Sequence, residues 1–79
     1  MNADFSSWLA DHGYSAKVQS DILSRLKRAS TFINIDSYKR GDSALLNLER
    51  KSNFLTLSVG VKSQLRRSVR LYFEFKSST

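Results

Sequence analysis

Apolar residues recur at helical spacing in two long stretches of the chain. One continuous stripe lies within residues 16–33 and consists of Val18, Ile22, Leu26, Ala29 and Ile33. Another lies within residues 58–76, where about 100° of rotation per residue places on one side Val61, Leu65, Val69, Tyr72 and Phe75. Such stripes are typical of amphipathic helices that bury one face. Two long helices are therefore predicted, the second with Ser58 as its N-cap.

A short helix is predicted before them, over residues 3–11. Gly13 follows it at the place where a left-handed C-terminal cap is expected. Ser15 is then well placed to cap the helix over residues 16–33, because its hydroxyl can accept an exposed backbone N–H.

The chain between the two long helices predicts a linker, a third helix and a connector. Residues 34–41 are a polar linker with several turn formers. A third helix is predicted over residues 44–51, with Asp42 or Ser43 as its N-cap. Residues 54–57 are an apolar connector that is expected to pack against the core. Because apolar and polar residues partly alternate over residues 54–61, a strand is the alternative for that stretch.

Composition limits the fold to one small all-α domain. The 79 residues are 41% hydrophobic and contain neither proline nor cysteine. The absence of proline favours helices, and without cysteine neither a disulfide framework nor a thiolate zinc site can form. The prediction is a compact four-helix bundle over residues 1–79. With no apolar run of about 18–20 residues and no signal peptide, a soluble, cytoplasmic protein is expected.

All of the net charge lies in the C-terminal half. Residues 1–38 contain four basic and four acidic side chains, whereas residues 39–79 contain nine basic and three acidic ones. The difference of six in the second half equals the formal net charge of +6, and the sequence pI is about 10.1. This asymmetry is typical of a module that binds a polyanion, since Lys and Arg displace the counterions condensed on DNA or RNA. A mildly basic solvated surface is the plainer alternative.

Three groups of basic residues are candidate polyanion contacts. The first lies opposite the apolar stripe of the helix over residues 58–76 and consists of Lys62, Arg66, Arg67 and Arg70. The second lies in the linker and consists of Tyr38, Lys39 and Arg40. The third lies on the helix over residues 16–33 and consists of Lys17, Arg25, Lys27 and Arg28. Asp21 stands four residues from both Lys17 and Arg25, so ion pairs along that helix are expected.

Residues that would support catalysis are scarce. The single histidine, His12, falls at the end of the first predicted helix, where a favourable interaction with the helix dipole explains it. No spaced set of His, Cys or carboxylate residues is suited to a metal ion, and no glycine-rich loop is suited to a phosphate. The chain is therefore expected not to be an enzyme, and to need no cofactor, metal or small-molecule substrate.

Three passages share the order of elements of a known family. FSSWLADHGYSAKVQSDILSRLKRASTFI contains an opening helix, a Gly-Tyr-Ser turn and a second helix with a terminal aromatic. DSALLNLERKSNFLTLS contains a short third helix and a connector. VKSQLRRSVRLYFEFK is a final helix in which Arg70, Tyr72 and Phe75 approximate an Arg-x-Tyr-x-x-Phe pattern. Together they resemble the N-terminal core-binding, or SAM-like, domain of tyrosine recombinases and phage integrases.

The resemblance implies a four-helix module that clamps one side of duplex DNA, with its second and fourth helices near the major groove. By position, the implied contacts are Ser15, Lys17, Arg25, Lys62, Arg66, Arg67 and Arg70. The basic groups described above add Arg28, Lys39 and Arg40. The family's catalytic domain is absent, so the chain is either a DNA-binding part of a recombinase or a stand-alone protein on the same scaffold. A catalytic recombinase domain or another protomer is then a further partner.

Other functions stay open at this point. The basic face could bind an acidic protein partner, as a small phage or mobile-element regulator would. Leu71 and Phe73 lie outside the apolar stripe of the last predicted helix, so they either widen its buried arc or dock a second domain or protomer. Peripheral membrane binding by that helix is disfavoured, because Tyr72 and Phe75 are expected in the core.

Overall fold

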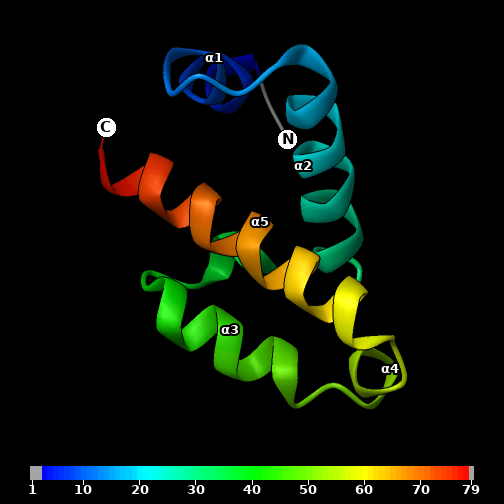
Figure 1. The fold of residues 1–79 in the computed structure, drawn as a ribbon. Coiled ribbons are helices and arrows are strands. Elements are labelled where there is room, and N and C mark those ends of the chain that lie inside the picture. The colour runs from blue at the N-terminus through cyan, green and yellow to red at the C-terminus, as the bar shows by residue number, and fades with distance from the viewer. Residues whose placement is uncertain (1–2, 79) are drawn as a thin grey trace.

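Residues 3–78 are described by the computed structural model, and over this range the chain is helical without any strand. The elements are α1 (Ala3–Asp11), α2 (Ala16–Ala29), the 3-10 helix η1 (Ile35–Ser37), α3 (Gly41–Glu49), α4 (Ser52–Leu55) and α5 (Val59–Ser77). Figure 1 shows α5 crossing the molecule between α2 and α3, with α1 at the far end of α2. The all-α prediction is confirmed, and the strand alternative for residues 54–61 is wrong.

Helix α1 begins and ends where the sequence predicts, and α2 begins at its predicted first residue, Ala16. Gly13 has a φ of +87°, a left-handed conformation that glycine adopts without strain, and it ends the turn after α1. Ser15 caps α2, and its Oγ accepts a 3.3 Å hydrogen bond from the backbone N–H of Val18. Gln19 ties the two helices together, since it donates to the carbonyl of Tyr14 at 2.8 Å and accepts from the Ser6 hydroxyl at 3.0 Å.

Helix α2 is shorter than predicted and ends at Ala29 instead of residue 33. The hydroxyl groups of Ser30 and Thr31 donate 2.6 Å hydrogen bonds to the carbonyls of Lys27 and Arg28. These side chains satisfy carbonyl groups that a continuing helix would use, which favours termination. Ile33 is still buried, so the apolar stripe is right although its last residue lies outside the helix.

Helix α3 begins three residues earlier than predicted and ends two residues earlier, at Glu49. Its N-cap is Arg40, whose side chain makes no capping hydrogen bond, so the predicted capping by Asp42 or Ser43 is wrong. The early start brings Gly41 against Phe73 of α5. A Cβ atom on Gly41 would lie 3.2 Å from that of Phe73, so the absence of a side chain allows this close approach.

The predicted apolar connector contains a single turn of helix, α4, and only part of it packs into the core. Phe54 is completely buried, and its ring meets that of Phe32 edge to face. Leu55, next to it, is 56% exposed, so the expectation that the whole connector packs is wrong. Neighbouring residues of a helical turn point about 100° apart, and α4 turns Phe54 toward the core and Leu55 away from it.

The core is organised around α5, the longest helix. Its buried side includes Leu65, Val69 and Tyr72, which pack with residues of α1, α2, α3 and α4. Leu71 and Phe73 are also buried, at 8% and 7% exposure, so α5 buries an arc wider than its apolar stripe. The wider-arc interpretation is confirmed, and neither residue offers a docking surface.

The predicted polar linker contributes to the core through η1. Ile35 is buried, which the sequence analysis missed. The neighbouring Asp36 accepts a 2.6 Å hydrogen bond from the Tyr72 hydroxyl of α5 and lies 3.6 Å from the Nζ of Lys76. Burial, together with this hydrogen bond and the charge of Asp36, raises the pKa of Tyr72 to about 12. These contacts hold the linker against α5.

No helix within residues 3–78 combines the length and the apolarity needed to cross a lipid bilayer.

Candidate nucleic-acid interface

The outward side of α5 carries the first predicted group of cations. We call this group, Lys62, Arg66, Arg67 and Arg70, the α5 basic surface. Arg67 and Arg70 are exposed, whereas Lys62 and Arg66 are half-buried. All four residues lie along one side of α5, as predicted, with Arg67 and Arg70 turned outward and Lys62 and Arg66 at the border of the buried side.

Arg66 is held in place by residues of α3 and α4. Its Nε donates a 2.6 Å hydrogen bond to Oε1 of Glu49, at the end of α3. Its guanidinium lies 5.6 Å from the ring centroid of Phe54, within the range of a cation–π interaction. Arg66 therefore supports the packing of α3 and α4 on α5, and its charge is already paired in this structure.

Arg67 connects the α5 basic surface to the turn between α1 and α2. Its guanidinium lies 5.8 Å from the ring centroid of Tyr14, the residue before the N-cap Ser15. Lys17 lies on the exposed first turn of the same helix. The predicted contacts Ser15, Lys17 and Arg67 are thus brought to one edge of the molecule. Ser15 also has a structural role, since its hydroxyl oxygen caps α2.

Arg70 lies beside the start of α3, in a groove between α3 and α5. Asp42 and Glu74 line the same groove, so the surroundings of Arg70 are partly acidic. Asp42 is itself paired with Arg40 at 3.0 Å, and both side chains are largely exposed. The linker cations Lys39 and Arg40 therefore lie near the C-terminal half of α5, away from the edge formed by Ser15 and Lys17.

The predicted cations of α2 are arranged differently from the expectation. Within residues 3–78 neither Lys17 nor Arg25 makes an ion pair with Asp21, so that prediction is wrong. Arg28 is exposed in the last turn of α2, where a cation interacts favourably with the helix dipole. Arg25 is half-buried and lies roughly 120° around α2 from Gln19, away from the contact with α1.

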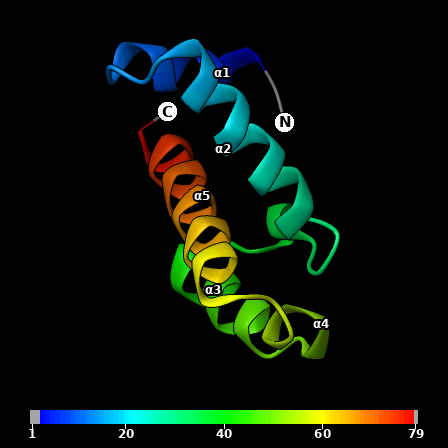
Figure 2. The ribbon, with the colours of Figure 1, turned by 45° about the vertical axis from the view of Figure 1, so that its right-hand side comes forward.

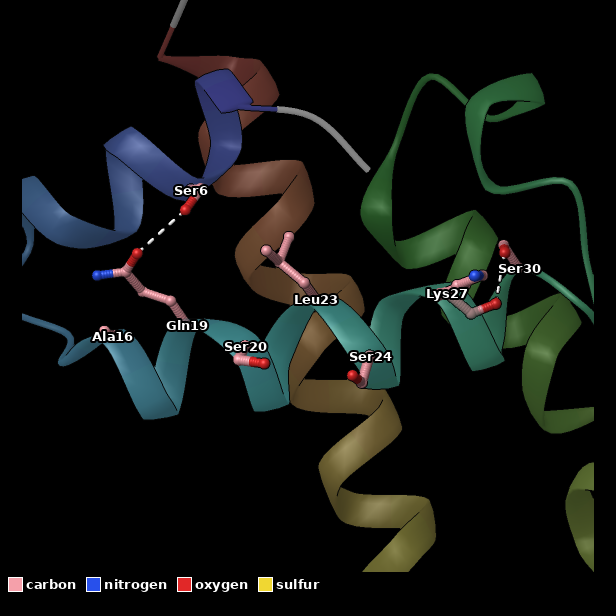
Figure 3. Close-up of a pocket in the computed structure, with 8 residues that line it drawn as sticks. All are labelled: Ser6, Ala16, Gln19, Ser20, Leu23, Ser24, Lys27 and Ser30. Carbon is pink, nitrogen blue, oxygen red and sulfur yellow. Dashed lines mark hydrogen bonds between the residues drawn. The ribbon is translucent and has the colours of Figure 1, made fainter.

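A groove lined by serines runs along α2 on the flank nearer α1. Its lining residues, drawn in Figure 3, are Ser6, Ala16, Gln19, Ser20, Leu23, Ser24, Lys27 and Ser30. Lys27 is the single charged side chain among them, and two of the serines hydrogen-bond within the protein, Ser6 to Gln19 and Ser30 to Lys27. No shared location was predicted for these serines. Ser20 and Ser24 are one helical turn apart, and this spacing indicates that both lie on the same side of α2.

Arg50 and Lys51 were not predicted as candidates, although they follow Glu49 directly at the corner between α3 and α4. Both are exposed, and the Glu49–Arg66 pair places this corner beside the α5 basic surface. They belong to the nine basic residues of the C-terminal half, and that count was the sequence feature that could have identified them as candidates. They extend the cationic surface from α5 onto the end of α3.

Other kinds of site find no support in the described part of the chain. Among residues 3–78 no group of three or more His, Cys, Asp or Glu side chains could hold a metal ion. His12 makes local contacts, with Nδ1 at 2.8 Å from the Trp8 carbonyl and its ring stacked at 4.0 Å on that of Trp8.

Comparison with known proteins adds no assignment, because no protein-family model, curated protein or solved structure matches the chain.

Proposed function

We propose that this chain is a helical DNA-binding module that contacts duplex DNA through α5 and the adjoining end of α2. The observation that carries the proposal is the α5 basic surface, whose exposed members Arg67 and Arg70 face away from the core. Lys and Arg in such a row neutralise phosphates and release their counterions, which supplies most of the non-specific affinity for DNA. Ser15, Lys17 and the corner residues Arg50 and Lys51 extend the surface on either side.

We further propose that the module is the core-binding part of a site-specific tyrosine recombinase or integrase, of the SAM-like type. The proposal rests on the order of the helices and on the three sequence passages that resemble this family. The fourth helix of the expected bundle corresponds to α5, and the single turn α4 takes the place of the expected connector. In this role the chain positions DNA and performs no catalysis itself.

The test is fluorescence anisotropy of a labelled duplex of about 30 base pairs at several salt concentrations. The proposal predicts that the logarithm of the affinity falls steeply with the logarithm of salt concentration, with a slope of about −0.9 for each phosphate neutralised. The informative variant is R67A/R70A, because both side chains are exposed and lie outside the Glu49 pair. It should lower the slope by about two units and leave the fold intact.

A matched control is Lys27→Ala, which removes an exposed cation from the serine-lined groove on the other flank of α2. This variant should keep the slope of the wild-type chain. Absence of binding even at low salt would overturn the proposal and leave an acidic protein as the candidate partner for the basic surface. The double variant removes two charges and the control one, so a loss in the control half as large as in the double variant would mean that the net charge alone drives binding, without an interface on α5.

A further inference from the structure

The most exposed large apolar side chain in residues 3–78 lies at the N-terminal end of α5. Val59 is 80% exposed, compared with 56% for Leu55 and 52% for Leu46. On α5, Val59 precedes Arg66 by about two helical turns and Arg70 by about three, so it shares their outward side. An apolar side chain thus continues the row of cations.

Neither the backbone conformation nor the packing at the next residue, Gly60, requires a glycine. Its φ is not in the left-handed region, where Gly13 alone is found among the described glycines. A Cβ atom built on Gly60 would meet no other atom within 4 Å, so packing does not exclude a side chain either. Glycine in a helix is less stable than alanine. A glycine at this position would allow a ligand to approach the backbone closely.

Leu55 adds a second exposed apolar side chain at the same corner of the molecule. It is the last residue of α4, and three residues separate it from Val59. Its backbone N–H donates to the carbonyl of Lys51, one turn earlier in the chain. We call Leu55, Val59 and Gly60 the apolar patch. The patch lies between the corner cations and the α5 basic surface.

We propose that the apolar patch contacts base edges in the major groove of the bound DNA, above all the methyl groups of thymine. This inference rests on the proposed function. The major groove is about 12 Å wide and admits one helix, and apolar side chains there recognise the C5-methyl of thymine. The cations along α5 would lie against the phosphates, while Val59 reaches the floor of the groove and Gly60 lets the backbone come close.

The experiment uses two synthetic duplexes that differ only in this methyl group, poly(dA-dT) and poly(dA-dU). Anisotropy competition against each polymer, at one fixed salt concentration, gives the ratio of the two affinities. The wild-type chain should bind the thymine polymer roughly three to five times more tightly, the effect of one methyl group removed from water.

Val59→Ala should bring this ratio close to one, because it removes the side chain that meets the methyl group. Leu46→Ala is the control, since it truncates an exposed apolar side chain of α3 that lies outside the patch. The control should keep the wild-type ratio. An unchanged ratio in Val59→Ala would overturn the proposed contact.

Gly60→Ala tests the close approach separately from folding. Alanine fits the open space and favours the helix, so the melting temperature should stay the same or rise. Binding to both polymers should nevertheless weaken several-fold. Unchanged binding by this variant would overturn the close approach at Gly60.

The failure of this inference differs from that of the proposed function. Equal, salt-dependent binding of both polymers by the wild-type chain would overturn the methyl contact and leave DNA binding in place. Binding of neither polymer at low salt would overturn both, and the apolar patch with its flanking cations would then be a candidate contact for a protein partner.

Discussion

Arg66 of α5 donates a 2.6 Å hydrogen bond from its Nε to Oε1 of Glu49, the last residue of α3. This pair joins two helices that are antiparallel neighbours and places an acidic side chain within the proposed DNA surface. A phosphate that approaches Arg66 must therefore compete with Glu49 for its guanidinium. The pair consequently has opposite effects on stability and on the proposed affinity for DNA.

Glu49→Gln should raise the affinity for a 30-base-pair duplex several-fold and make the salt slope steeper by about one unit, since one more cation becomes free to bind phosphate. Anisotropy at several salt concentrations measures both quantities. Asp4→Asn is the matched control, because it makes the same change in net charge on α1, which lies at the opposite end of the molecule from α4 and the end of α3 (Figure 1). If the affinity for DNA rises equally in the two variants, Glu49 has no local effect on the interface.

Arg66→Ala should lower the free energy of unfolding by about 1 kcal/mol, because the variant loses the pair with Glu49 and the contact with the ring of Phe54. Arg70→Ala should stay within about 0.5 kcal/mol of the wild-type chain, as expected for an exposed side chain. Urea unfolding followed by circular dichroism compares them. Equal unfolding free energies for the two variants would show that the contacts of Arg66 with Glu49 and Phe54 do not stabilise the fold.

Tyr72 should make the stability depend on pH in the alkaline range. The fold raises its pKa from 10.0 to about 12, so the folded state favours the neutral phenol. This contribution is complete below the unfolded value and is lost as the pH rises from about 10 to 12. The difference in unfolding free energy between the wild-type chain and Tyr72→Phe should therefore shrink across that range. A constant difference would contradict the assignment. Urea unfolding monitored by Trp8 fluorescence, repeated between about pH 9 and 12, measures it.

Phe54 and Leu55 are adjacent, but truncation should destabilise the protein far more at Phe54 than at Leu55. Phe54→Ala leaves a cavity in the core and should cost about 3–5 kcal/mol, enough to unfold much of the population of so small a protein. Leu55→Ala removes a side chain that is 56% exposed and should cost less than about 1 kcal/mol. Thermal melts of the two variants give the comparison. Similar melting temperatures would mean that α4 packs differently.

A corner such as α4 is hard to predict from local pattern. Figure 2 shows α4 and the end of α3 at one extremity of the molecule, with α5 leaving from it. Phe54 and Leu55 are both strongly apolar, so their sequence does not distinguish them. Their difference in burial depends on which side of α4 packs on the core, where the ring of Phe54 meets that of Phe32, a residue remote in the chain.

The long helices were predictable because their information is local. The apolar stripes of α2 and α5, the left-handed Gly13 and the caps Ser15 and Ser58 each depend on residues within a few positions. The sequence pattern also placed the four cations of the α5 basic surface on one side of one helix. The ends of α2 and α3 were misjudged, since side-chain hydrogen bonds at Ser30 and the approach of Gly41 to Phe73 decided them.

By itself the sequence determined an all-helical chain, the charge asymmetry and the outward row of cations on α5, because helical periodicity converts spacing directly into faces. Only the tertiary structure decided which cations are already paired, as Arg66 is with Glu49, and which remain exposed, as Arg67 and Arg70 do. It also decided that Leu71 and Phe73 are buried while Val59 is exposed. The physical reason is that pairing and burial depend on which helices pack against a face, and those neighbours are far away along the chain.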